Sequence, residues 1–160
     1  MKFHLLDRIE ELTTDRCVAV KNVTQAEEYL ADHFPSFPVL PGVLMLEAAT
    51  QAAAWVAFER AGLKAEGDYD GPTVAVLKSA RNVRYGHFVA PGRTLRMTAE
   101  HAKDIDGGHA FKIEGTVETD SGTKTAITGK LELACFRLSD RGATGDERLI
   151  EAHRARRAVL

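Results

Sequence analysis

Two side chains capable of proton transfer flank a Pro-Gly pair in the segment from His33 to Glu47, which reads His-Phe-Pro-Ser-Phe-Pro-Val-Leu-Pro-Gly-Val-Leu-Met-Leu-Glu. His33 carries an imidazole that is largely neutral at pH 7 and can accept a proton. Glu47 lies in an apolar run, and apolar surroundings favour the protonated form of a carboxyl group. A neutral base and a protonated acid are the groups needed to remove a proton beside a carbonyl and expel a hydroxyl group.

The Pro41-Gly42 pair comes directly before a run that predicts a helix, so the first amides of that helix lie between the two candidate residues. A helix N-terminus offers unpaired N–H groups and the positive end of the helix dipole. Glycine lacks a Cβ, so its backbone can approach a ligand closely. We therefore predict that Gly42, followed by Val43, binds the substrate and stabilises the negative charge that develops on its carbonyl oxygen.

The element that must position Glu47 is a predicted helix over residues 43–60, which contains no Gly or Pro and is closed by Gly62. Gln51 falls one helical turn after Glu47, on the same face, and is predicted to orient it or a water. The run is apolar almost all the way round and rich in alanine, which is typical of a helix buried on every face. A sheet wrapped around one central helix would explain this composition.

Strands are predicted on both sides of this helix, at residues 3–12, 15–23, 73–85, 93–104, 109–119 and 124–137. Asp106-Gly107-Gly108 and Asp120-Ser121-Gly122 supply hairpin turns, residues 25–30 form a short helical turn, and residues 63–72 form a loop. This order of elements indicates an α+β fold. Residues 1–138 are interpreted as one domain and residues 139–160 as a C-terminal tail with a short helix from Asp146 to Arg157.

Composition excludes several classes of protein. The 160 residues suit one domain, and a formal net charge of −2 gives no basic footprint for nucleic acid. Cys17 and Cys135 show no paired spacing, so a reduced, cytoplasmic protein is expected, with no membrane span and no secretion signal. No two histidines share a metal-ligand spacing on one element, so no metal is expected and the remaining histidines are assigned to surface or strand positions: His4, His87, His101, His109 and His153.

The segment from His33 to Glu47 resembles the active-site segment of the 3-hydroxyacyl-acyl-carrier-protein dehydratases of fatty-acid synthesis, which have the hot-dog fold. Flanking matches support the resemblance over roughly residues 3 to 136, including Lys78-Ser79-Ala80-Arg81 and Val89-Ala90-Pro91-Gly92. It implies dehydration of a 3-hydroxyacyl chain carried on the phosphopantetheine arm of an acyl carrier protein, with no cofactor. It also implies a homodimer, or an oligomer built from dimers, in which His33 of one subunit meets Glu47 of the other, with Gln51 lining the site.

The chain departs from the family pattern at Asp32, Phe37 and Arg93, which leaves the acyl chain length and the pathway open. Two other functions remain open: a hot-dog thioesterase that uses Glu47 to activate water, and a non-catalytic acyl-binding subunit. Trp55 and Phe58 are expected to close an acyl tunnel along the helix, unless Trp55 is ordinary core. A carrier-docking patch is expected from basic residues: Lys78, Arg81, Arg84, Arg93 and Arg96.

Overall fold

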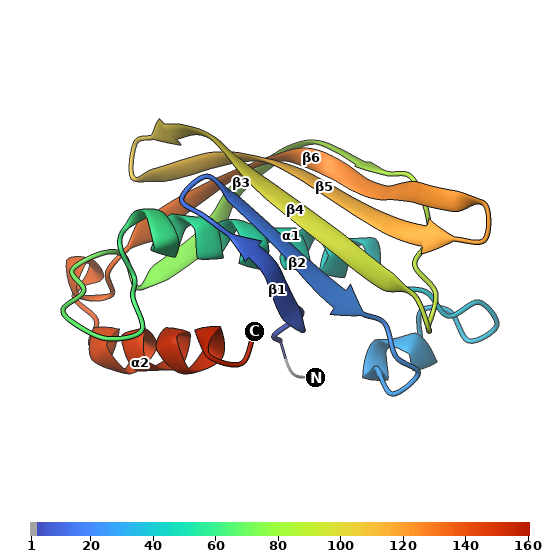
Figure 1. Ribbon diagram of the computed structural model, residues 1–160, viewed down its shortest axis with the longest axis horizontal. Helices are drawn as coiled ribbons and strands as arrows, with labels where there is room; N and C mark the ends of the chain where they lie inside the picture. Colours follow the sequence, from blue (N-terminus) through green and yellow to red (C-terminus); the bar gives the residue numbers. More distant parts are fainter. Residues whose placement is uncertain (1–2) are drawn as a thin grey trace.

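The computed structural model describes residues 3–160, and within them one antiparallel sheet curves around a long central helix, α1 (Gly42–Arg60) (Figure 1). The strand order is β1-β2-β4-β5-β6-β3. The strands are β1 (Arg8–Leu12), β2 (Arg16–Asn22), β3 (Val74–Tyr85), β4 (Thr94–Ile105), β5 (Gly108–Thr119) and β6 (Gly122–Phe136). This is the predicted α+β architecture, and the helix held in the curve of the sheet is the hot-dog fold.

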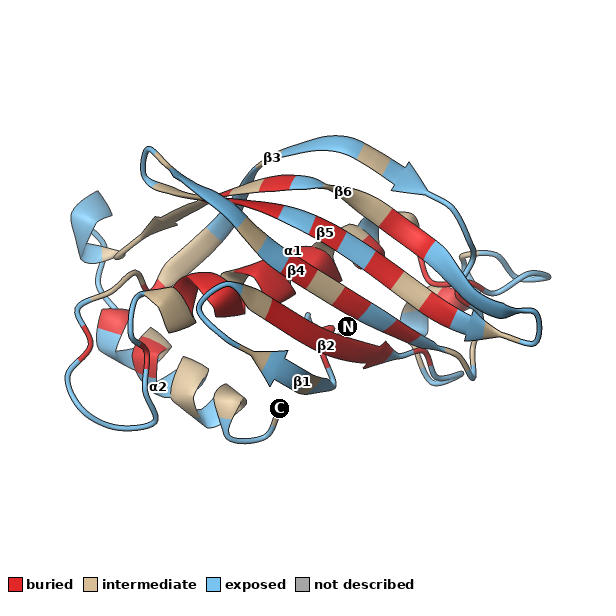
Figure 2. Cartoon of the chain, turned by 45° about the horizontal axis from the view of Figure 1, so that its top comes forward, coloured by how far each residue is buried: buried red, intermediate tan, exposed pale blue. Residues whose placement is uncertain are grey.

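The core lies between α1 and the concave face of the sheet (Figure 2). The helix presents to the sheet a face of small side chains that are fully buried, among them Ala48, Ala49, Ala52 and Ala53. Strand residues alternate between this core and the outer surface, as a period of two requires. Small alanines let the sheet approach the helix closely, which leaves the larger strand side chains to fill the space: Leu95, Met97, Phe111, Ile127, Leu131 and Leu133.

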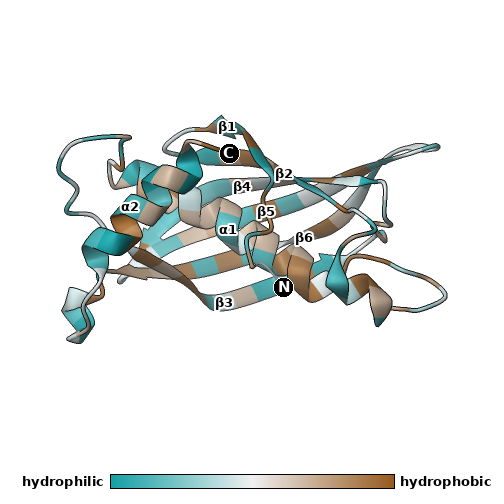
Figure 3. Cartoon of the chain, turned by 90° about the horizontal axis from the view of Figure 1, so that it is seen from below, coloured by the Kyte–Doolittle hydropathy of each residue, from teal (hydrophilic) through white to brown (hydrophobic). Residues whose placement is uncertain are grey.

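The prediction that α1 is buried on every face was wrong for its outward side. Val43 is exposed, while Leu44, Leu46, Glu47 and Gln51 are only half-buried. The physical reason is geometric, because the sheet covers one side of the helix. Among the described residues no helix or strand lies over the first half of the opposite side, which the N-terminal segment reaches only at Gln51 (Figure 3). The apolar residues of this first half are therefore available to something outside the chain.

The second half of the outward side is covered by α2 (Asp146–Arg157), which spans the residues for which the sequence predicts a short helix. This C-terminal segment packs onto the body of the protein. The His153 ring lies 4.5 Å from that of Phe58, and the amide of Ile9 on β1 donates to the carbonyl of Leu160 at 2.9 Å. The division of the chain at residue 138 stays a prediction.

Several element bounds differ from those predicted. Residues 3–7 are not a strand, because the amide of Leu5 donates to the side chain of Gln51 instead of to a neighbouring strand. The helical turn predicted at 25–30 is a 3-10 helix at Glu28–Ala31. Both predicted hairpin turns are present, between β4 and β5 and between β5 and β6. No helix within residues 3–160 is long and apolar enough to cross a membrane.

Candidate active site

His33 sits at the start of a tight loop that leads into α1, and backbone hydrogen bonds fix it on both sides. Its amide donates to the carbonyl of Tyr29 at 3.0 Å, and its carbonyl accepts from the amide of Val39 at 3.0 Å. The ring nitrogen Nδ1 lies 3.1 Å from the carbonyl oxygen of Val39. A carbonyl can only accept, so Nδ1 carries a proton. This hydrogen bond orients the ring of His33 and makes Nε2 the nitrogen that can accept a proton.

The N-terminus of α1 follows this loop and has two backbone amides without a hydrogen-bond partner among the described residues. Pro41 precedes the helix without a capping side chain, and its carbonyl accepts the amides of Leu44 and Met45 at 2.9 and 3.2 Å. Within the described residues 3–160, the amides of Gly42 and Val43 make no hydrogen bond. These N–H groups at the positive end of the helix dipole can receive a developing oxyanion.

A neighbour that the sequence did not indicate packs closely against Gly42. A Cβ at this position would lie 2.9 Å from Cε1 of Tyr85, at the end of β3, which is closer than real Cβ contacts allow. The ring of Tyr85 therefore rests against the first turn of α1. Its separation from Gly42 along the chain is too long for any local pattern to have revealed the contact.

Glu47 lies half-buried on the outward side of α1, one and a half turns into the helix. Its Oε1 accepts a hydrogen bond of 3.0 Å from Nε2 of Gln51. Gln51 in turn binds the N-terminal segment, donating to the carbonyl of Phe3 at 2.7 Å and accepting from the amide of Leu5 at 3.0 Å. The side-chain amide of Gln51 is thereby held in one orientation, and Oε2 of Glu47 makes no hydrogen bond among the described residues.

The single chain does not join the two candidate catalytic residues. His33 contacts Val39 and the ring of Phe34, whereas Glu47 contacts Gln51. No hydrogen bond links His33 to Glu47 among the residues that the structure describes. The site within one chain therefore holds a base, two free amides and an acid along one loop-helix segment, without closing them into a single hydrogen-bonded set.

Exposed apolar side chains surround this segment. We call them the apolar rim: Phe34, Phe37, Val43, Tyr85 and Phe88, each more than half exposed. The rings of Phe37 and Phe88 meet edge to face at 5.3 Å, so the rim joins the loop before α1 to the loop after β3. A contiguous group of exposed large apolar residues marks a contact surface.

The three departures from the family pattern have different consequences. Asp32 is exposed, and Phe37 belongs to the apolar rim. Arg93 donates to the carboxylate of Asp120, directly after β5, at 2.9 Å and to the carbonyl of Glu118, near the end of β5, at 3.3 Å. None of the three forms a hydrogen bond with His33 or Glu47 among the described residues.

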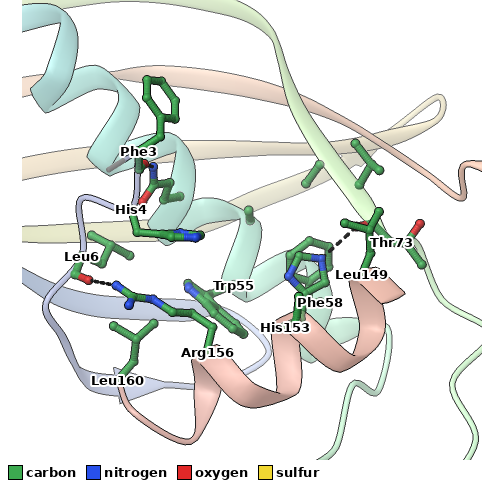
Figure 4. A pocket seen from close by; sticks show the side chains of 15 residues that line it. Phe3, His4, Leu6, Trp55, Phe58, Thr73, Leu149, His153, Arg156 and Leu160 are labelled. Carbon is green, nitrogen blue, oxygen red and sulfur yellow. Dashed lines mark hydrogen bonds between the residues drawn. The ribbon is translucent and has the colours of Figure 1, made fainter. Parts of the chain in front are cut away.

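An apolar pocket of about 460 Å³ begins at Gln51 and follows the outward side of α1 (Figure 4). Trp55 and Phe58 line one wall, and Leu149 and His153 of α2 line the facing wall. His153 Nε2 donates to the carbonyl of Thr73 at 2.8 Å, which fixes the ring against the pocket. Such a volume and lining suit a flexible apolar ligand.

Two histidines that the sequence left without partners lie together with Asp104 at the other end of the fold. Asp104 Oδ1 is 3.0 Å from Nε2 of His101 and 2.9 Å from Nδ1 of His109. The hydrogen bond with His109 holds the pKa of Asp104 below its ordinary value. Spacing along single elements could not reveal this group, because its members come from two paired strands.

The fold and the site together define a hot-dog protein with a loop-helix reaction segment. The chain belongs to the FabA-like family, whose domain model matches residues 1–127. It is 41% identical over 139 residues to the 3-hydroxyacyl-[acyl-carrier-protein] dehydratase FabZ of Solibacter usitatus (strain Ellin6076), covering 87% of this chain and 78% of that protein. It is 35% identical over 133 residues to FabZ of Clostridium perfringens (strain SM101 / Type A), covering 82% and 87%.

Solved structures agree on the fold. The dehydratase heterocomplex ApeI:P from Xenorhabdus doucetiae contains a chain with a TM-score of 0.66 and 18% identity, covering 87% of both chains. A hypothetical thioesterase with coenzyme A from Streptococcus pneumoniae TIGR4 has a TM-score of 0.58 and 14% identity, covering 81% of this chain and 85% of that one. At these identities the likeness shows the hot-dog architecture and no more.

Proposed function

We propose that this protein is a 3-hydroxyacyl-[acyl-carrier-protein] dehydratase that forms trans-2-enoyl thioesters in fatty-acid or related acyl-chain synthesis. The observation that carries the proposal is the order of functional groups along the segment from His33 to Glu47. A histidine oriented by a hydrogen bond from its Nδ1, two unpaired amides and a carboxyl group follow one another there. The dehydratases that the chain resembles at 35% and 41% identity support the same reaction.

In the proposed reaction the thioester carbonyl oxygen accepts hydrogen bonds from the amides of Gly42 and Val43. His33 Nε2 removes a proton from the carbon next to that carbonyl, and the two amides stabilise the negative charge that develops on the oxygen. The carbon–oxygen bond to the 3-hydroxyl group then breaks as Glu47 Oε2 gives it a proton, so water leaves and the double bond forms. Gln51 orients Glu47 through its hydrogen bond to Oε1. These steps require no redox group or metal.

The active assembly in this proposal is a homodimer, or an oligomer built from dimers. The apolar rim and the uncovered first half of α1 leave apolar surface next to the site. In addition, β3 is an edge strand of twelve residues with exposed Val76 and Leu77, and such an edge can pair with a second copy. The opposite edge, β1, is short and bonded to the chain's own C-terminus.

The proposed carrier-docking patch is smaller than the five basic residues that the sequence suggested. Lys78, Arg81 and Arg84 are exposed on β3, near the end of the sheet that holds Tyr85. Arg96 lies on β4 and pairs with Glu10, and two strands separate β4 from β3, a distance of roughly 14 Å. Arg93 is committed to Asp120. We therefore assign docking of an acidic carrier protein, with its phosphopantetheine arm, to the β3 residues.

The proposed acyl site is the apolar pocket beside α1. The thioester must sit at Gly42, and the hydrocarbon tail can then pass Glu47 and Gln51 into the space lined by Trp55 and Phe58. Each buried CH₂ group stabilises the complex by about 0.8 kcal/mol. We place the protein in the cytoplasm, which its free Cys17 and Cys135 support.

The proposal is tested by following enoyl formation from a 3-hydroxyacyl thioester on a carrier protein, with the wild type, His33→Ala and Glu47→Gln. We expect each variant to lose about a hundredfold or more of the turnover, the usual contribution of a positioned acid or base. His109→Ala serves as a matched histidine control and should keep wild-type turnover. Melting curves check that all variants remain folded.

Near-wild-type turnover by either His33→Ala or Glu47→Gln would contradict the mechanism. Free thiol release is measured in the same reactions. Thioester cleavage that persists in His33→Ala, without enoyl formation in the wild type, would identify a thioesterase that uses Glu47 alone.

A further inference from the structure

The group formed by His101, Asp104 and His109 is a polar cluster on the concave face of the sheet, just beyond the end of α1. The side chains of His101 and His109 are 11% and 20% exposed, and both rings contact the buried ring of Phe111. Their positions continue the rows of strand residues that elsewhere supply the apolar core. The ligand atoms of the three residues all lie within 4.8 Å of one another.

An irregularity in β4 creates this arrangement. His101 pairs with Phe111 and Lys103 pairs with Ala110, so Ala102 is an additional residue in β4 with no partner in β5. Regular alternation would place residues three apart on opposite faces of a strand. The bulge reverses this and turns Asp104 to the same face as His101, directly opposite its register partner His109. The bulge thus places the carboxylate of Asp104 within hydrogen-bonding distance of both imidazole rings.

We propose that His101, Asp104 and His109 form a site for a divalent transition metal ion, of which Zn²⁺ is the best match. Two imidazole nitrogens and one carboxylate oxygen are a donor set that suits zinc, and water completes the four-coordinate shell. Bonds of about 2.0–2.1 Å in a tetrahedral site require donor atoms about 3.3 Å apart. The separations of Asp104 Oδ1 from the two imidazole nitrogens, 2.9 and 3.0 Å, need to widen by a few tenths of an ångström. The two nitrogens lie within 4.8 Å of each other and need to come to about 3.3 Å as well.

The surroundings allow an ion to enter. Asp104 is 67% exposed, and it borders an open pocket of about 390 Å³ with Thr14, Ala61 and His109. The guanidinium of Arg60 also approaches Asp104, at 3.5 Å. Its shorter contacts are with the carboxylate of Asp15 at 2.7 Å and the carbonyl of Thr14 at 3.1 Å. Arg60 therefore keeps two hydrogen-bond partners when Asp104 binds an ion.

The site is remote from the reaction segment and does not depend on the proposed function. Gly42 and Arg60 mark opposite ends of α1, which for nineteen residues is a length of about 28 Å. The turn between β4 and β5 lies at the same end of the molecule as the C-terminus of α1 (Figure 1). A bound ion would join the two strands near this turn, so its role is to stabilise the end of the sheet.

The test uses tag-free protein that has been stripped with a chelator and titrated with ZnCl₂ in a calorimeter. We expect one ion per chain, and a melting temperature that rises with Zn²⁺ concentration, because a ligand bound to the folded state stabilises it. His101→Ala and His109→Ala should each weaken binding at least tenfold and remove the rise in melting temperature. His87→Ala, which alters an exposed histidine outside the cluster, should bind as the wild type does.

Two further variants sharpen the result. Arg60→Gln removes a positive charge beside Asp104, and we expect it to bind Zn²⁺ severalfold more tightly. His33→Ala should keep the stoichiometry, which separates this site from the reaction segment. The proposal is overturned if the wild type shows no saturable binding of Zn²⁺, or if the double variant His101→Ala/His109→Ala binds as tightly as the wild type.

Discussion

At position 42 the ring of Tyr85 fills the space that a side chain would need, next to the amide that we propose binds the substrate. We expect Gly42→Ala to push this ring aside and shift the first turn of α1. Displacement of a positioned group by about 1 Å can cost up to a hundredfold in rate, so turnover should fall by about ten- to a hundredfold. Steady-state kinetics and a melting curve measure the effect. Tyr85 is half exposed and can move, so the variant should stay folded; wild-type turnover would show that the amides of this turn are not at the reaction centre.

Trp55 is 7% exposed and lines the apolar pocket at a point about 12 Å along α1 from Glu47. If its ring closes the space for the acyl tail, Trp55→Ala should extend activity to longer acyl chains without lowering activity on short ones. Turnover with carrier-bound substrates of increasing chain length measures this. Val56→Ala is a matched control, because Val56 is fully buried beside it and does not line the pocket.

The alternative for Trp55 is a purely structural role, in which its loss would cost about 3–5 kcal/mol of folding free energy. Its edge-to-face contacts with Phe58 at 6.1 Å and His153 at 6.2 Å would then hold α2 in place. A large drop in melting temperature with an unchanged chain-length profile would reject the tunnel-stop role.

Single residues also show which features a sequence can reveal. Gly42 and Glu47 lie on one continuous segment, so their order along the chain was enough to place them at the helix start and within the helix. The carbonyl of Val39 and the ring of Tyr85 gave no such signal, because their roles depend on how the loop folds and on where β3 ends. The cluster of His101, Asp104 and His109 was missed for the same reason, since a bulge and a strand register create it.

Among the secondary-structure elements, α1 was predictable in position, because Gly42 and Gly62 bound an uninterrupted run. Its burial within one chain was overestimated, since composition cannot tell a face that the same chain covers from one that it leaves open. The first strand was predicted too long, because Phe3 and Leu5 are apolar yet their backbone groups bond to the side chain of Gln51 on α1. The pattern of apolar residues indicates burial in such cases, but burial alone does not determine which group forms hydrogen bonds with the backbone.

The start of α2 is held by the carboxylate of Asp146, which accepts from the hydroxyl of Thr73 and from the amides of Leu138 and Ser139 at 2.8 and 3.0 Å. Above all the hydrogen bond from Thr73 lowers the pKa of Asp146 well below its ordinary value of 3.8. We expect Asp146→Asn to lower the melting temperature by several degrees at pH 7, because three donors from outside α2 lose a buried carboxylate acceptor. Thermal unfolding followed by circular dichroism measures the change.

The difference in melting temperature between the wild type and Asp146→Asn should become smaller as the pH falls. A carboxyl group whose pKa is lowered by folding stabilises the folded state above its unfolded pKa, and that stabilisation is lost as the pH falls through the folded pKa. The gap between the wild type and Asp146→Asn should therefore be constant above about pH 5 and shrink below pH 3.8. Glu147→Gln, an exposed neighbour in the same turn, is the control. A gap that stays constant into strong acid would contradict the assignment.

At the scale of the whole molecule, the two edges of the sheet are unequal. The backbone of β1 receives the C-terminus, through the bond from the Ile9 amide to Leu160, whereas β3 is long and open. Open edge strands with exposed apolar side chains favour pairing with another chain. The apolar rim lies at the end of β3, so the surface that would close a dimer and the surface around His33 are continuous.

A dimer of this kind has a consequence for catalysis that mixing two inactive variants can detect. If His33 of one subunit works with Glu47 of the other, a heterodimer of His33→Ala and Glu47→Gln contains one fully intact site and one doubly impaired site. Refolding the two variants together in equal amounts should give half heterodimers, and therefore about a quarter of the wild-type turnover. Each variant refolded alone is the control and should stay inactive.

A site built within one chain cannot be restored in this way, because every chain in the mixture lacks one of the two groups. Sedimentation of the mixture reports whether dimers have formed, so an inactive mixture of well-formed dimers would place His33 and Glu47 of the same chain in one site.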